Sequence, residues 1–318
     1  MLFIKKENKI NIGMKNKYLL FFLSPMLFSL AGCNTKTTSK TPVDVVIISG
    51  QSNGVGCTWS NEIPNSMGMD KFDEYYKGYP EIQIAYNCWT KDWPATGITF
   101  YLQNAPIRKN FTDVKLGQGN GKHSFGPEIG IAEATHEKYA NKLFLIKFAC
   151  GGSNLKDDWL KENSPMYGKF IDYVKLQMSN LNDMGYKPTI KAFCWMQGEG
   201  DSYDGYYQSY QDNLRTFVGN VRNELRDLSG EKEFAFIDAG INNNKERWQY
   251  WKEVNDAKMA FAEESENNFY IDTIGAGMHT DQEPALNVDK DHYDSESEVL
   301  LGHLFAEAFE PFLMKPSE

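Results

Sequence analysis

The stretch VVIISGQSNGVG, residues 45–56, joins a run of β-branched apolar residues to a serine between two glycines. A short, nearly continuous apolar run is typical of a strand that is buried on both faces of a parallel sheet. Gly50–Gly54 fits the G-x-S-x-G pattern, in which a serine lies on a sharp turn between a strand and a helix. Ser52 is therefore a candidate nucleophile, although so short a pattern needs support from the rest of the chain.

Five apolar runs of this kind alternate with amphipathic segments. The runs are 43–49, 143–149, 190–196, 234–237 and 269–274, and the expected helices begin at 127, 165, 203, 247 and 295. This alternation predicts a three-layer α/β/α, doubly wound fold with a five-stranded parallel sheet. Residues 57–125 do not alternate cleanly, and we interpret them as a decorated insertion with short strands.

Two of these helices carry further predictions. Apolar and aromatic residues repeat at helical spacing over 203–228, which indicates a core-facing stripe more than a binding surface. Ser295 and Glu298 have the spacing of a capping box, which predicts the start of a last helix that ends near 312.

The N-terminus is typical of a secretory signal. A short basic segment after Met14 precedes an apolar run, and Leu-Ala-Gly stands directly before Cys33. We interpret 1–32 as a lipoprotein signal peptide, Cys33 as a lipidated residue, 33–41 as a tether and 42–318 as one domain. The alternative is an ordinary signal peptide with a chance cysteine. Either way the chain is expected to cross the inner membrane, and lipidation would hold it in the cell envelope, in the periplasm or at the cell surface.

Composition excludes some partners. The chain has 33 basic and 43 acidic residues, a net charge of −10, which disfavours nucleic acid. It has no C-x-x-C pair and no cluster with metal-ligand spacing, so we expect neither a metal nor a cofactor. The sequence does not determine the oligomeric state.

The cysteines allow one disulfide. Cys57 and Cys88 are the one pair that could form it, and the sequence leaves open whether they do. Cys150 and Cys194 lie on apolar runs and are expected to be buried thiols.

A serine nucleophile needs a base, and the chain has five histidines. His292 follows Asp289 by three residues in a turn, a spacing that lets the carboxylate reach Nδ1 of the imidazole. Ligand sites in doubly wound sheets lie past the carboxyl ends of the strands. Ser52, the segment 151–153 and the segment 197–199 all follow expected strands, which supports one site there.

Five motifs in order, GQSNGVG, FGPEIG, LIKFACGGSNLKDDW, WMQGEGD and DKDH, resemble the SGNH hydrolases. Within that superfamily the chain resembles carbohydrate esterase family six and the sialate O-acetylesterase-like group, with a flavodoxin-like fold. The resemblance implies that Ser52 is the nucleophile, His292 the general base and Asp289 its orienting acid. It also implies an oxyanion hole formed by the backbone N–H groups of Ser52 and Gly152 and the side-chain amide of Gln197.

Some roles stay open. Glu199 is an alternative acid to Asp289, and Gln51, Asn53 and Trp159 are candidate substrate-binding residues. Tryptophans 59, 89 and 93 could line the same face or pack within loops. The expected activity is serine-dependent removal of acetyl groups from a carbohydrate, first acetylated xylan and second 9-O-acetyl sialic acid. The rivals are a lipase-like or thioesterase member of the superfamily and a non-catalytic sugar-binding lipoprotein.

Overall fold

The computed structural model describes residues 39–90 and 110–315. The predicted signal peptide (1–32), the lipidation site Cys33 and Trp93 lie outside these ranges. Within them, a seven-stranded sheet has the order β4-β3-β6-β1-β7-β8-β9. No helix of the described residues is long and apolar enough to cross a membrane.

All of the five predicted strands are present. They are β1 (Thr41–Gly50), β6 (Leu143–Gly151), β7 (Tyr186–Met196), β8 (Ala235–Ala239) and β9 (Asn268–Ile271). They pair in parallel in the order β6-β1-β7-β8-β9. Numbered along the chain, these five strands run 2-1-3-4-5, which is the flavodoxin-like order, so the predicted α/β class is confirmed.

The predicted strand number was wrong, because the sheet has seven strands and not five. The extra strands lie in the 57–125 insertion: β3 (Tyr79–Thr90) runs parallel to β6, and β4 (Thr112–Val114) runs antiparallel to β3. In β3 the buried Ile82 and Ile84 flank the partly exposed Gln83, so no continuous apolar run marks the strand. The insertion also contributes β2 (Thr58–Trp59), β5 (Ser124–Phe125), α2 (Ile63–Ser66) and α3 (Met69–Lys77).

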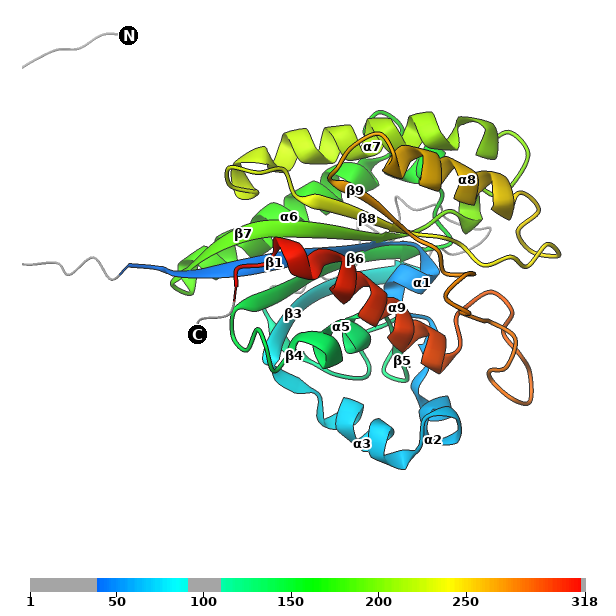
Figure 1. Cartoon of the computed structure of the whole chain (residues 1–318), viewed down its shortest axis with the longest axis horizontal. Helices are drawn as coiled ribbons and strands as arrows, with labels where there is room; N and C mark the ends of the chain where they lie inside the picture. The colour runs from blue at the N-terminus through cyan, green and yellow to red at the C-terminus, as the bar shows by residue number, and fades with distance from the viewer. Residues whose placement is uncertain (1–38, 91–109, 316–318) are drawn as a thin grey trace, which may run out of the picture. The chain divides into compact units, whose positions relative to one another are not determined.

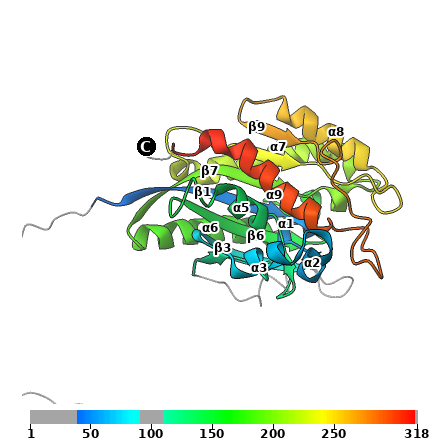
Figure 2. The same ribbon diagram turned by 60° about the horizontal axis from the view of Figure 1, so that its bottom comes forward.

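Helices cover both faces of the sheet. On one face lie α6 (Pro165–Asp183), α7 (Tyr210–Leu225) and α8 (Trp251–Ala262). On the other lie α1 (Ser52–Val55), α5 (Glu128–Thr135) and α9 (Ser295–Phe309) (Figure 1). α5 and α9 pack directly on each other, and Figure 2 shows them over the same face. Gly130 and Gly302 permit this approach, because a Cβ on Gly130 would lie 2.0 Å from the Val299 carbonyl oxygen.

Two predicted helix starts, 203 and 247, were wrong, and α8 begins at Trp251. The predicted start of the last helix at Ser295 was correct, but its predicted capping was not. α7 begins at Tyr210 and not at residue 203, so Tyr203 and Tyr206 precede the helix instead of joining its buried stripe. Ser295 is not the cap of α9, whose N-cap is Asp294. The Ser295 hydroxyl instead donates to the carboxylate of Glu283, 2.5 Å away, and this bond replaces the expected capping box.

The four cysteines of the described residues are free thiols. Cys150 and Cys194 are buried, as predicted, on β6 and β7. Cys57 and Cys88 are partly exposed and are not joined by a disulfide, the outcome that the sequence left open.

Candidate active site

A cavity of about 730 Å³ lies past the carboxyl ends of β1 and β6. Ser52, Gly152, Asp289 and His292 all line it, so the fold brings together predicted residues that are up to 240 positions apart in the chain. We call it the catalytic cavity. The remaining residues of its wall are Gln51, Cys57, Trp59, Asn120, Asn154, Gly200, Tyr203, Tyr206, Arg247, Trp248 and Asp291.

The turn that presents Ser52 depends on a glycine. Gly50 has a φ of +137°, and a Cβ at this position would lie 1.9 Å from the carbonyl oxygen of Met196. The next residue, Gln51, donates its backbone N–H to the same oxygen over 2.9 Å. The chain therefore leaves β1 pressed against the end of β7, and Ser52 becomes the first residue of α1.

The predicted contact between Asp289 and His292 is present. Oδ2 of Asp289 lies 2.6 Å from Nδ1 of His292, which leaves Nε2 as the nitrogen that can act on substrate. Burial lowers the pKa of His292, but its hydrogen bonds with Asp289 and Cys57 outweigh this and raise the pKa overall. Burial also acts to raise the pKa of Asp289, and the contact with His292 reverses the direction, so that pKa is lowered. Both shifts favour a charged His292–Asp289 pair.

Asn53 holds the loop that carries His292. Its Oδ1 accepts the backbone N–H of Tyr293 at 3.2 Å, and its Nδ2 donates to Oε1 of Glu199 at 2.8 Å. On the other side, the hydroxyl of Thr58 donates to the Tyr293 carbonyl oxygen. Asn53 is fully buried and braces this loop, and its role in substrate binding stays a prediction.

Glu199, the alternative acid, has a different hydrogen-bond partner. It is fully buried, and its hydrogen bond runs to Asn53 and not to His292. Its other oxygen has no hydrogen-bond partner within the described part of the chain. Burial raises the pKa of Glu199. Of the two carboxylates, only Asp289 has the contact that an orienting acid requires.

The three predicted oxyanion donors differ in position. Ser52 and Gly152 line the catalytic cavity, and Gly152 turns the chain there with a φ of +72°. Gln197 is fully buried, and its amide nitrogen donates to Asp201 at 2.7 Å and Gln51 at 3.2 Å. In this structure the amide of Gln197 links neighbouring loops, and its assignment to the oxyanion hole stays a prediction.

Trp159 does not line the cavity either. Its ring is fully buried against Trp195 and Phe148, and its Nε1 donates to the Ser153 hydroxyl at 2.9 Å. The π-helical turn Leu155–Trp159 carries this ring, which is fully buried, and its role in substrate binding stays a prediction. Trp89 is also largely buried, whereas Trp59 is 45% exposed and lines the cavity.

Sequence reasoning missed most of the aromatic wall. Tyr203, Tyr206 and Trp248 line the cavity with Trp59, and Arg247 stands among them. The two tyrosines were assigned to a helical stripe, while Arg247 and Trp248 come from the loop after β8. A sequence signal existed for all four residues, since the tyrosines follow β7, Arg247 and Trp248 follow β8, and the loops after parallel strands lie at this edge of the sheet.

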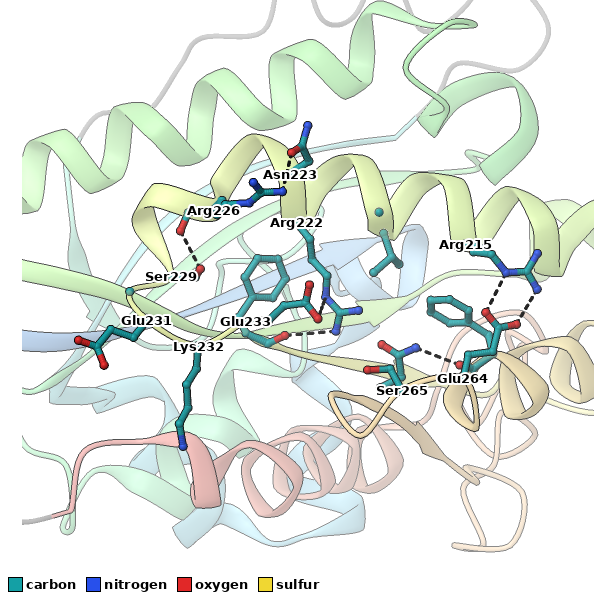
Figure 3. Close-up of a pocket in the computed structure, with 16 residues that line it drawn as sticks. Arg215, Arg222, Asn223, Arg226, Ser229, Glu231, Lys232, Glu233, Glu264 and Ser265 are labelled. Carbon is teal, nitrogen blue, oxygen red and sulfur yellow. Dashed lines mark hydrogen bonds and ion pairs between the residues drawn. The ribbon is translucent and has the colours of Figure 1, made fainter.

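A second hollow, of about 470 Å³, lies at the far end of α7 and at the segment that enters β8. Its three arginines are bound to neighbours: Arg215 pairs with Glu264, Arg222 donates to the carbonyl oxygen of Phe234, and Arg226 donates to Asn223 (Figure 3). No histidine stands among the described residues that line it. This hollow lies at the amino end of the sheet and offers no base for a serine.

One group of side chains could approach a metal ion, although none was expected. Ligand atoms of His279, Asp281 and Asp294 lie within 4.8 Å of one another. The Asp294 oxygens already accept from His279 Nδ1 and from the backbone N–H groups of Gln282 and Glu283. These hydrogen bonds give Asp294 a structural role, because they hold the loop together.

The fold places a strand-end serine, Ser52, in the same cavity wall as the His292–Asp289 pair, which is the set of groups that serine hydrolases use. A family described as carbohydrate esterase, sialic acid-specific acetylesterase, matches residues 42–310. The chain belongs to this family, and the predicted resemblance is confirmed. It is accordingly a carbohydrate acetylesterase by family and a carboxylic ester hydrolase by class. No curated protein sequence matches the chain.

Solved structures support the same fold. NanS has a TM-score of 0.60 at 13% identity, covering 86% of this chain and 98% of its own. A protein from Arabidopsis thaliana has a TM-score of 0.56 at 20% identity, covering 86% and 100%. A carbohydrate acetylesterase from Xanthomonas citri has a TM-score of 0.50 at 14% identity, covering 85% of this chain and 56% of its own. At these identities the likeness establishes the architecture.

Proposed function

We propose that this protein is a serine-dependent O-acetylesterase that removes acetyl groups from a neutral polysaccharide such as acetylated xylan. The observation that carries the proposal is the 2.6 Å contact between Asp289 and His292 in the wall of the cavity that Ser52 also lines. The family supplies the ester chemistry, and this contact supplies an oriented base beside a strand-end hydroxyl.

In the proposed reaction, Ser52 Oγ attacks the acetyl carbonyl while His292 accepts the hydroxyl proton. Negative charge then develops on the carbonyl oxygen, and the backbone N–H groups of Ser52 and Gly152 are the proposed donors to it. Collapse of the tetrahedral species expels the sugar alkoxide, to which His292 returns the proton. Water activated by His292 then hydrolyses the acetyl-enzyme and releases acetate.

The charges of the cavity favour a neutral sugar over sialic acid. Sialic acid carries a carboxylate, which is best held by a free arginine or lysine. Among the described residues of the cavity wall, Arg247 is the one such cation, and its guanidinium is bound by Asp291. Four aromatic side chains in the same wall offer the flat apolar surfaces that suit the faces of sugar rings.

The description of the family, which names sialic acid, supports an acetylated sialic acid as an alternative substrate. A sialate 9-O-acetylesterase is therefore the second candidate, and it requires a substrate carboxylate to displace Asp291 from Arg247. The proposal also includes export through the signal in 1–32 and anchoring through lipidated Cys33 in the cell envelope.

The test is acetate release from acetylated xylan, acetylated xylo-oligosaccharides and 9-O-acetyl sialic acid, with wild type beside Ser52→Ala. We expect release from the xylan substrates and a loss of at least about a thousandfold in Ser52→Ala. Release from the sialate alone would favour the second candidate. Binding of the glycans without acetate release by wild type would instead indicate a non-catalytic sugar-binding protein.

A series of 4-nitrophenyl esters separates the proposal from a lipase-like or thioesterase activity. We expect kcat/KM to fall when the acyl chain is longer than acetyl or propionyl. A steady rise toward long acyl chains would contradict the acetylesterase assignment.

A further inference from the structure

A shallower hollow adjoins the catalytic cavity. It measures about 430 Å³, and both volumes fall within the ~300–1,000 Å³ typical of ligand pockets. We call it the outer hollow. It shares four residues with the catalytic cavity, Trp59, Arg247, Asp289 and Asp291, and adds Pro284, Asn287, Val288 and Lys290.

The shared residues make the outer hollow continuous with the reacting groups. Asp289 contacts His292 on the catalytic side and also lines the outer hollow. Trp59 and Arg247 line both spaces, so they stand between them. A chain-like ligand that occupies the outer hollow therefore continues past these two side chains toward Ser52.

The chemistry of the outer hollow suits an uncharged sugar ring. Trp59 is 45% exposed and presents an aromatic surface, while Val288 adds an apolar contact. Its ionic groups balance, because Arg247 and Lys290 oppose Asp289 and Asp291, and Arg247 is held by Asp291. Asn287 is exposed and offers an amide, which can both donate to and accept from sugar hydroxyls.

We propose that the outer hollow is a second sugar subsite and that the protein acts on acetylated sugar chains in preference to acetylated monosaccharides. This proposal rests on the proposed function and adds the place where a neighbouring ring of the neutral sugar chain binds. One ring occupies the outer hollow against Trp59, and the acetylated ring next to it lies in the catalytic cavity.

The first test compares kcat/KM for mono-acetylated xylose, xylobiose and xylotriose. Ring contacts in a second subsite predict a rise of about tenfold or more from the monosaccharide to the longer substrates, since tenfold corresponds to ~1.4 kcal/mol. Equal values across the series would overturn the proposal, even though all three substrates were hydrolysed.

The second test fills the outer hollow. Asn287→Trp places a bulky ring there, at a position outside the wall of the catalytic cavity. We expect the ratio of kcat/KM for xylotriose acetate to that for xylose acetate to fall at least fivefold. The matched control is Asn65→Trp on α2, which is exposed and lines neither space, and it should keep the wild-type ratio. An unchanged ratio in Asn287→Trp would overturn the subsite.

A binding measurement separates this proposal from the proposed function. Calorimetric titration of Ser52→Ala with unacetylated xylotriose should show binding that Asn287→Trp weakens in the same background. If no glycan releases acetate but this dependence is present, the subsite stands and the esterase assignment fails. If glycans are deacetylated but xylotriose binding is unaffected by Asn287→Trp, the subsite fails and the esterase stands. Absence of both would overturn both.

Discussion

The loop between β9 and α9 holds two histidine–aspartate pairs with the same geometry and different surroundings. In one, Asp289 Oδ2 lies 2.6 Å from His292 Nδ1, and in the other, Asp294 Oδ2 lies 2.6 Å from His279 Nδ1. The first pair lines the catalytic cavity with Ser52, and the second does not. A histidine–carboxylate contact is thus not by itself a mark of catalysis.

The two aspartates differ in what else they bind. Asp294 is 2% exposed and also accepts the backbone N–H groups of Gln282 and Glu283, so its charge fastens the loop. The side chain of Asp289 is 31% exposed and reaches the cavity wall, where its charge can stabilise an imidazolium during reaction. Substitutions at the two pairs should therefore separate activity from stability.

The largest effect is expected at the acid of the cavity pair. Asp289→Asn removes the charge that opposes the imidazolium and allows the wrong histidine tautomer, so kcat should fall by about 10²–10⁴-fold. Glu199→Gln should cost less than about tenfold, because Glu199 is buried and bonds to Asn53. Initial rates on acetylated xylan measure both. The reverse ranking would give the orienting role to Glu199.

Much of the site was predictable because its residues stand at strand ends. The apolar runs located β1, β6 and β7, and the carboxyl edge of the sheet then brought Ser52 and Gly152 together. The three-residue spacing of Asp289 and His292 was sufficient to predict their contact. The family resemblance rested on the same segments.

The side-chain directions were less predictable. Gln197 follows β7 as closely as Gly152 follows β6, and Trp159 lies in the loop after β6. Both side chains nevertheless turn into buried contacts, with Asp201 and with Ser153. Sequence spacing gives the position of a residue along a loop, whereas the direction of its side chain depends on packing with distant segments. β3 was missed for a different reason, since the partly exposed Gln83 stands between the buried Ile82 and Ile84 and interrupts the apolar run.

The next effect concerns pH. A general base must be neutral to accept a proton. Because the pKa of His292 is raised, kcat/KM should rise with pH, and the midpoint of this rise should lie above ~6.5, the usual pKa of histidine. Cys57→Ala removes one neighbour that raises the pKa of His292, so in this variant the rise of kcat/KM should occur at lower pH. The pH profile on 4-nitrophenyl acetate measures the shift. A rise that stays at the same pH, or moves to higher pH, would contradict the influence of Cys57.

At the second pair we expect a loss of stability. Asp294→Asn weakens charge-assisted hydrogen bonds to the N–H groups of Gln282 and Glu283, so the free energy of unfolding should fall by roughly 1.5–3 kcal/mol. Urea denaturation measures this change. Activity per folded molecule should fall far less than in Asp289→Asn. A comparable loss of activity would contradict the assignment of catalysis to one pair and stability to the other.

The smallest effect on activity and stability is expected for His279→Gln. The substitution His292→Gln makes the same change at the other pair, so the two variants can be compared directly. Glutamine keeps a side-chain donor for Asp294, and His279 is already 30% exposed, so the free energy of unfolding should change by less than ~1 kcal/mol. Because this histidine lies outside the catalytic cavity, kcat/KM on acetylated xylan should stay within about twofold of wild type. In His292→Gln the same change removes a base that can take up a proton, so kcat should fall by at least about a hundredfold. Similar losses of kcat/KM in both variants would mean that the two contacts of 2.6 Å have the same role in activity. The position of His292 in the cavity wall would then not set it apart from His279.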